Sequence, residues 1–339
     1  MPRPARTTLR PRRVAAATLL AGALALTACG TAVTPAASEG TATHAVSLTN
    51  CAREITIGAV PERVVGMHPA QTELLLRLGL ADRLAGQAQA TAQQLPEDVA
   101  ALAADVPVIG GAMPPSREDL LATEPDFVYS PTTYEFSAEK GFASIDQLTA
   151  AGASVYVASG GCQDRRMTGE VVDLFTDLDN LGQIFAQQDR AAELIAENQA
   201  VLDRVAAATA DVEPLRVAEV YVEGSALQVI GAGVEHDILV RAGAEPVYTP
   251  DQALFSDFFA ATVSAESLAA EAPDALVIAP YDAENEAMMR DYLTRTFPDM
   301  PAVRDGRIIA VSSSDMFPGT LGNITAVKTI AEALYPDAF

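Results

Sequence analysis

Apolar and polar positions along the chain follow two different periods, and this pattern predicts strands and helices in turn. Short apolar runs over residues 63–67, 126–130 and 154–158 are typical of buried strands. Between them, apolar residues recur at helical spacing over 70–80 and 145–151. Strands that alternate with helices in this way indicate a small α/β domain in the first half of the chain.

The pattern changes in the middle of the chain. Residues 168–210 carry apolar stripes at helical spacing, and the run that starts near residue 189 would be roughly 30 Å long at the usual helical rise. After this run, strand patterns and a last helix return at 215–222, 275–279, 307–311 and 324–334. The pattern therefore predicts an α/β fold of two lobes joined by a long helix.

We divide the chain into five parts. They are a signal peptide at 1–28, a flexible tether at 29–46, an N-terminal α/β lobe at 47–187, a linking helix at 188–212 and a C-terminal α/β lobe at 213–339.

Two segments of thirteen residues, SREDLLATEPDFV at 116–128 and SAESLAAEAPDAL at 264–276, are identical at six positions. Each predicts a serine helix cap, a glutamate in the first turn, a short helix and a Pro-Asp turn into a strand. The segments fall at matching places in the two predicted lobes, which favours a repeated lobe. The general likeness of capped helices before strands is the alternative, and a first-turn glutamate also suits the helix dipole.

The N-terminus has the layout of an export signal, with five arginines, no acidic residue and then an apolar run over 14–28. The run ends in Leu-Thr-Ala-Cys-Gly, which resembles the lipobox at which bacterial lipoprotein precursors are acylated and cut at the cysteine, here Cys29. We therefore expect a lipid on Cys29, such as palmitate, to be the membrane anchor. An ordinary signal peptide with a chance cysteine is the alternative, and Arg12-Arg13 leaves the twin-arginine export route open.

Charge and motifs exclude several classes of function. The formal net charge is −23, so nucleic acid is a poor partner. The sequence contains no Cys-x-x-Cys, His-Glu-x-x-His or Gly-x-Ser-x-Gly motif. Once Cys29 carries lipid, Cys51 and Cys162 remain in an exported chain, so we expect a disulfide between them, with two buried free thiols as the alternative.

Several short segments together resemble helical-backbone (class III) substrate-binding proteins of ABC importers for ferric siderophores, haem and cobalamin. They include PERVVG at 61–66, TELLLRLGLADRL at 72–84, LGQIF at 181–185 and PAVRDGR at 301–307. The resemblance covers nearly all of the chain after the tether and implies a cleft between two lobes, with a rigid helix that permits only small closure. It also implies a binding protein and not an enzyme, a monomer, and a permease dimer as partner.

Within this resemblance, loops at strand ends should line the cleft. We expect Tyr134, Arg165 and Arg166 in the first lobe to face Phe258, Phe259 and Tyr281 in the second. Aromatic rings offer flat contact to a bulky chelate, and arginine donates to carboxylate, hydroxamate or catecholate oxygens. The aromatic residues could instead belong to the core and the arginines to the solvated surface. His68 either touches the ligand or caps the following helix.

The resemblance also assigns a role to Glu118 and Glu266, the first-turn glutamates of the two repeated segments. The matching glutamate in each lobe of the family meets arginines of the permease. Each glutamate is the second residue after its serine cap, a position that the reciprocal capping box does not use.

Other functions rank lower on the sequence. A binding protein for free zinc or manganese needs a cluster of histidines and carboxylates, and only His68 and His236 lie outside the tether. An enzyme on the same frame with a metal cluster would need several cysteine ligands. Among chelates we rank a ferric siderophore first, cobalamin or another corrinoid second and haem third, and we expect no resident cofactor or metal.

Overall fold

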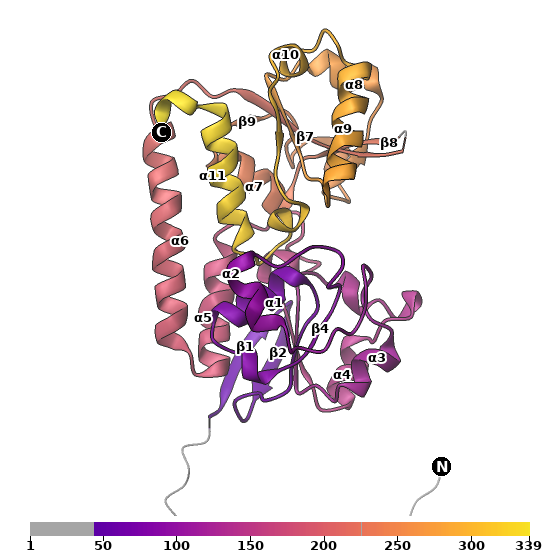
Figure 1. Ribbon diagram of the computed structural model, residues 1–339, viewed down its shortest axis with the longest axis vertical. Helices are drawn as coiled ribbons and strands as arrows, with labels where there is room; N and C mark the ends of the chain where they lie inside the picture. The colour runs from indigo at the N-terminus through magenta and orange to yellow at the C-terminus, as the bar shows by residue number, and fades with distance from the viewer. Residues whose placement is uncertain (1–43, 225) are drawn as a thin grey trace, which may run out of the picture. The chain divides into compact units, whose positions relative to one another are not determined.

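The computed structural model describes residues 44–224 and 226–339, and Figure 1 shows its ribbon. The expected signal peptide, Cys29 and nearly all of the expected tether lie outside the described residues.

The described chain begins with a hairpin that the hydrophobic pattern did not predict. Strand β1 (Val46–Asn50) pairs antiparallel with β2 (Arg53–Ile57), so the hairpin starts within the segment assigned to the tether. Cys51 and Ala52 at its tip have φ values of 51° and 56°. Positive φ at both central residues suits a two-residue hairpin turn, but Cys-Ala lacks the Asn-Gly or Asp-Gly signal that would have revealed it.

A parallel sheet of four strands forms the centre of the first lobe, in the order β4-β3-β5-β6. The strands are β3 (Val64–Gly66), β4 (Leu84–Gln87), β5 (Phe127–Ser130) and β6 (Ser154–Val157). Helices α1 (Pro69–Arg77), α2 (Glu97–Ala100), α3 (Arg117–Ala122) and α4 (Ile145–Ala150) lie between or beside them. All residues of β3 and β5 are buried, which is typical of parallel strands covered on both faces.

Two long helices follow the first sheet. Helix α5 (Asp173–Phe185) ends at Ala186, which has a left-handed φ of 55°, and α6 (Gln188–Thr209) then continues the chain as its longest helix. The apolar stripes over 168–210 therefore belong to two helices, and the break between them lies just before the run expected from residue 189. A left-handed residue ends a helix readily when it is glycine, and an alanine there gave no sequence signal.

The second lobe contains a mixed sheet in the order β10-β8-β7-β11-β12, with β9 also paired to β7. Its strands are β7 (Arg216–Glu223), β8 (Ala226–Ile230), β9 (Glu245–Pro246), β10 (Ala260–Thr262), β11 (Ala275–Ile278) and β12 (Ile308–Ala310). Its helices are α7 (Gly233–Arg241), α8 (Ala265–Glu271), α9 (Ala283–Thr296), α10 (Pro301–Arg304) and α11 (Gly322–Leu334). Strands β8 and β10 run antiparallel to their neighbours, and the sequence pattern predicted neither of them.

One apolar core joins the two sheets. Its buried residues include Phe127 in the first sheet, Leu178 and Leu202 on α5 and α6, and Val277 and Ile330 in the second lobe. Figure 1 shows α6 alongside α5 and α11, and α6 packs against each of them. No helix among the described residues is long and apolar enough to cross a membrane.

Candidate functional site

A cleft of about 650 Å³ lies where loops of the two lobes face each other. The first lobe contributes segments that follow β4, β5 and β6, and the second contributes the segment before β10 and the one after β12. The residues that line it are Gln89, Thr132, Thr133, Tyr134, Glu135, Ser137, Gly161, Gln163, Arg166, Met167, Asp257, Phe258, Phe259 and Phe317. Loops beyond the carboxyl ends of parallel strands are the usual place for a ligand in an α/β fold.

Aromatic side chains form the apolar part of this cleft. Tyr134 is 43% exposed and Phe258 is 57% exposed, although large apolar side chains are usually covered. Phe258 lies against Phe259 with ring centroids 4.4 Å apart. The structure thus brings Tyr134, Phe258 and Phe259 to one cleft, and their contact with a ligand stays a prediction. Phe317, which follows β12, also lines the cleft and was not among the residues expected to contact a ligand there.

Arg166 lines the cleft, but its guanidinium group already has partners. Both terminal nitrogens donate to the carboxylate of Glu235 on α7, and the guanidinium carbon lies 3.6 Å from the Phe259 ring centroid. The Arg166 side chain is 19% exposed and that of Glu235 is 8% exposed. Arg166 therefore holds a loop of the first lobe against α7 and supports Phe259, rather than presenting a free fork to a ligand.

Arg165 does not belong to the lining of the cleft. Its Nη2 donates to both carboxylate oxygens of Asp173, at 2.8 Å each. Asp173 is the first residue of α5, where a carboxylate also suits the helix dipole. Arg165 thus fixes the start of α5, and this role could not be predicted because the fold decides which acid an arginine contacts.

His68 is a buried helix cap. Its Nδ1 accepts a hydrogen bond from the Ala70 N–H at 3.3 Å, and only 4% of the residue is exposed. Burial lowers the pKa of His68 to about 4, so the ring is neutral at physiological pH. The ring lies 4.6 Å from that of Phe317, so His68 supports a residue of the cleft wall.

Tyr281 lies in a second depression, of about 600 Å³, rather than in the main lining. Residues 90–94 of the first lobe form one side of it, and Tyr281 with Asp282 forms the other. Gln93 crosses between the lobes, since its Nε2 donates to the Ser312 hydroxyl at 2.6 Å. The loop that follows β4 therefore borders both depressions, through Gln89 in one and residues 90–94 in the other.

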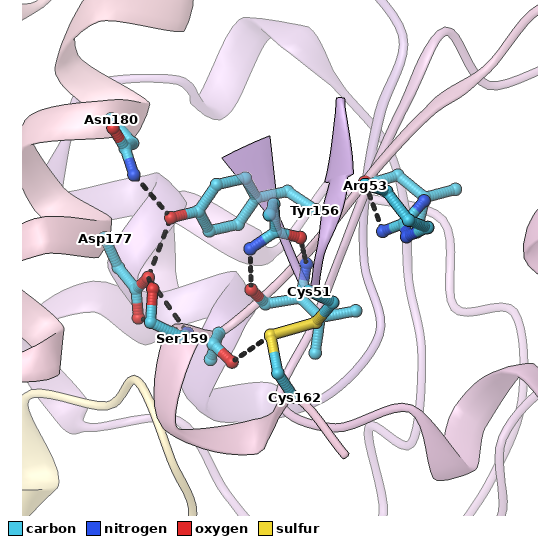
Figure 2. The surroundings of a disulfide bond; sticks show 11 residues. Cys51, Arg53, Tyr156, Ser159, Cys162, Asp177 and Asn180 are labelled. Carbon is cyan, nitrogen blue, oxygen red and sulfur yellow. Dashed lines mark hydrogen bonds between the residues drawn. A yellow bond between two sulfur atoms is a disulfide. The ribbon is translucent and has the colours of Figure 1, made fainter. Parts of the chain in front are cut away.

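A disulfide bond and a buried polar network support the loop that follows β6 (Figure 2). In the structure Cys51 is bonded to Cys162, with their Cα atoms 5.1 Å apart. Nearby, the carboxylate of Asp177 accepts hydrogen bonds from the Tyr156 hydroxyl at 2.8 Å and from the Ser159 hydroxyl at 2.6 Å. Burial raises the pKa of Asp177 to about 7. The loop that carries Arg166 is thus fixed at its start.

A further depression, of about 590 Å³, lies beside Cys51 and is also lined by residues such as Arg53, Ile145 and Asp146. All of its lining residues come from the first lobe. The cleft with aromatic walls from both lobes is therefore the better candidate for a ligand site.

Comparison with known proteins identifies the family. A family model described as "Periplasmic binding protein" matches residues 64–314, which is most of the chain. The chain belongs to the periplasmic binding protein family. Members of this family bind substrates for transport, so this is a binding protein and not an enzyme. Its extracytoplasmic location follows from the same membership.

Solved structures share the fold of this periplasmic binding protein. A periplasmic binding protein from Veillonella parvula is 24% identical with a TM-score of 0.76, and the match covers 87% of this chain and 98% of that one. An ABC-type Fe3+-hydroxamate transport system protein from Saccharomonospora viridis is 24% identical with a TM-score of 0.69, over 85% and 98% of the two chains. A periplasmic heme binding protein from Pseudomonas aeruginosa is 25% identical with a TM-score of 0.65, over 82% and 94%. No curated protein matches the sequence significantly.

The two repeated segments of the binding protein have the same local structure. Ser116 caps α3 and Ser264 caps α8, each accepting from the backbone N–H three residues later, at 3.1 Å and 3.2 Å. Glu118 and Glu266 are the second helical residues, and both are exposed. Glu118 also contacts its neighbour Arg117 at 2.6 Å, but 69% of its side chain remains exposed.

Replacing Arg166 by methionine should lower the free energy of unfolding by roughly 2 to 3 kcal/mol, because Glu235 would keep a largely buried charge without its partner. This loss is smaller than that for a fully buried ion pair, since both side chains retain some contact with solvent. Glu235→Gln should restore part of the loss in the Arg166→Met background. Urea unfolding of both single variants and the double variant measures this coupling. Strictly additive losses would contradict a paired role.

Proposed function

We propose that this periplasmic binding protein captures a metal chelate, a ferric siderophore, and delivers it to the permease dimer of an ABC importer. The observation that carries the proposal is the cleft with exposed aromatic walls from two lobes, Tyr134 on one side and Phe258 on the other. Siderophore chelates are bulky and present flat organic groups, so aromatic walls bury much of their surface. The volume of the cleft falls in the range of small-molecule sites.

The names of structural neighbours support an iron chelate as the ligand. The Saccharomonospora viridis protein is named for Fe3+-hydroxamate transport. Another neighbour, 17% identical with a TM-score of 0.64, is a siderophore binding protein, BauB, bound to ferric iron and two molecules of acinetobactin. The Pseudomonas aeruginosa neighbour is a heme binding protein, so haem belongs in the test.

The test is a ligand panel measured on the purified binding protein. Ferric hydroxamate, ferric catecholate, haem and cobalamin are added separately, and the melting temperature is recorded, because a ligand that binds only the folded state raises it. We expect at least one ferric siderophore to raise the melting temperature. Stabilisation by haem or cobalamin alone would contradict a siderophore, and stabilisation by none would contradict chelate binding.

The aromatic walls provide the matching variants. Phe258→Ala with Phe259→Ala should weaken binding of the stabilising chelate by roughly ten- to a hundredfold, since each lost ring contact is worth on the order of 1 kcal/mol or more. Val240→Ala is the control, because Val240 is 45% exposed but lies outside the lining of the cleft. If both variants bind the chelate with equal affinity, the chelate does not bind between these aromatic walls.

We further propose that a lipid on Cys29 anchors the protein to the outer face of the membrane. The support is the Leu-Thr-Ala-Cys ending of the export signal. In cells, Cys29→Ser should leave the precursor uncleaved or release the protein into the medium. Metabolic labelling with a palmitate analogue follows the lipid, and a variant that is still labelled and processed would refute the anchor.

A further inference from the structure

We infer that the cleft selects a chelate that is neutral or positively charged over one that is negatively charged. This inference rests on the proposed function, because it names the charge class of the ligand at the same site. It reverses what the two arginines suggested in the sequence, and it follows from the charged groups of the cleft and their partners.

The cation of the cleft wall is neutralised. Among the described residues that line the cleft, Arg166 is the one with a positive side chain, and its two terminal nitrogens are taken by Glu235. Glu219 on β7 interacts electrostatically with both members of this pair, and only 4% of the residue is exposed. Its Oε2 has no hydrogen-bond partner among the described residues. Burial and the charge of Glu235 both raise the pKa of Glu219. Whether Glu219 is protonated or not, Arg166, Glu235 and Glu219 together carry no net positive charge.

The remaining charged residues of the lining are acidic. Glu135 is buried and accepts hydrogen bonds from Thr132 and Ser130 at 2.6 Å and 3.2 Å, and burial raises its pKa. Asp257 is exposed beside Phe258. In the second depression the charged residue of the lining is Asp282. Within the part of the chain that the structure describes, the linings of both depressions therefore carry carboxylates and, apart from the paired Arg166, no basic side chain.

One more cation lies close to the lining and must be counted. Lys140 is exposed, and its Nζ lies 5.1 Å from the ring centroid of Tyr134. Lys140 itself does not line the cleft, although it lies near the Tyr134 ring. The residue before it in the chain is the acidic Glu139. Lys140 thus offsets part of the acidic charge on one side, which makes Lys140→Ala an informative variant.

The consequence follows from electrostatics inside a partly enclosed site. A chelate with several negative charges would lose solvation and would meet Asp257 in the cleft, while Asp282 in the second depression would repel it from farther away. The guanidinium group of the cleft lining, that of Arg166, is already paired with Glu235. A neutral chelate loses little solvation free energy on entering the cleft. A positively charged group is attracted both to carboxylates and to the faces of the aromatic rings. The formal net charge of −23 acts in the same direction at longer range.

The experiment uses one chelate in three charge states. The ferric complex of desferrioxamine B has a free terminal amine and is positively charged, its N-acetyl form is neutral, and its N-succinyl form is negatively charged, while the iron-binding groups stay the same. Affinities for the purified binding protein are measured by calorimetry, since the chain contains no tryptophan to report binding by fluorescence. A ferric tris-catecholate is added as a strongly anionic probe.

We expect affinity to fall from the amine form to the acetyl form to the succinyl form, by about fivefold for each unit of charge at moderate ionic strength, which is the size of a partly screened charge interaction. Asp257→Asn should reduce the differences in affinity between the three charge forms, and so should Asp282→Asn. Lys140→Ala should increase these differences. Glu213→Gln, an exposed acid outside both depressions, should leave them unchanged.

The outcomes separate the two proposals. If the succinyl form or the tris-catecholate binds as tightly as the amine form, the charge inference is wrong while chelate binding stands. If the amine form binds most tightly but neither Asp257→Asn nor Asp282→Asn reduces its advantage in affinity, the inference is also wrong. Other residues would then cause the discrimination. Binding of none of the probes, together with no response to the wider panel, overturns the proposed function itself.

Discussion

Reversing the charge of both exposed glutamates, Glu118→Arg with Glu266→Arg, is expected to reduce uptake of the chelate to the level of cells that lack the protein. Each glutamate is exposed at the start of an equivalent helix, α3 or α8, one in each lobe. If arginines of a two-fold permease receive them, each reversal replaces an attraction by a repulsion at the same place. The double variant should therefore fail to dock.

Binding and stability separate this role from a structural one. The double variant should keep its chelate affinity and nearly its melting temperature, because exposed single charges contribute little to stability. The control is Glu213→Arg with Asp337→Arg, which changes the net charge equally at two other exposed positions. Normal uptake by Glu118→Arg with Glu266→Arg would leave both residues as acids that stabilise helix starts.

Removing the disulfide, by Cys51→Ala with Cys162→Ala, should lower the free energy of unfolding by about 4 kcal/mol. The two cysteines are 111 positions apart, so the bond closes a long loop and restricts the unfolded chain strongly. It also fixes the tip of the β1–β2 hairpin to the loop after β6 (Figure 2). Urea unfolding of the oxidised protein and of the double variant measures the difference.

Reductant supplies the matched control for the disulfide. Dithiothreitol should move the unfolding midpoint of the wild-type protein toward that of the double variant and leave the double variant unchanged. Peptide mapping without reductant should recover Cys51 and Cys162 in one linked fragment. Two thiols that react with an alkylating agent in the native protein would contradict the bond.

The strands that could be predicted most clearly from the sequence are those whose residues are all buried, because they form continuous apolar runs. Runs such as FVYS at 127–130 and ALVI at 275–278 are fully buried strands, and their apolar character alone marked them. The strand LAGQ at 84–87 was missed, since alanine, glycine and glutamine carry no strand preference. The hairpin at 46–57 was missed because it has only weak alternation and an uncommon turn.

The site was predicted more completely for aromatic residues than for charged ones. Phe258 is exposed and Phe259 is half-buried in the loop before β10, so the structure does not place these rings in the core, which was the alternative. The partners of Arg165 and Arg166 could not be predicted, since Asp173 and Glu235 are eight and 69 positions away and many other acids were available. Sequence shows that an arginine is present, whereas the fold decides whether its donors are free.

One apolar cluster contains residues of both sheets, beside a further cluster within each lobe, and this shared cluster couples the folding of the two lobes. Phe127 of the first lobe and Val277 of the second belong to the same cluster, with α5 and α6 between the sheets in the chain. A fragment cut at either end of α6 would expose apolar residues of the shared cluster that the other part now covers, and exposed apolar patches favour aggregation. The protein should therefore melt in one cooperative transition, and a destabilising substitution in one lobe should weaken the other equally.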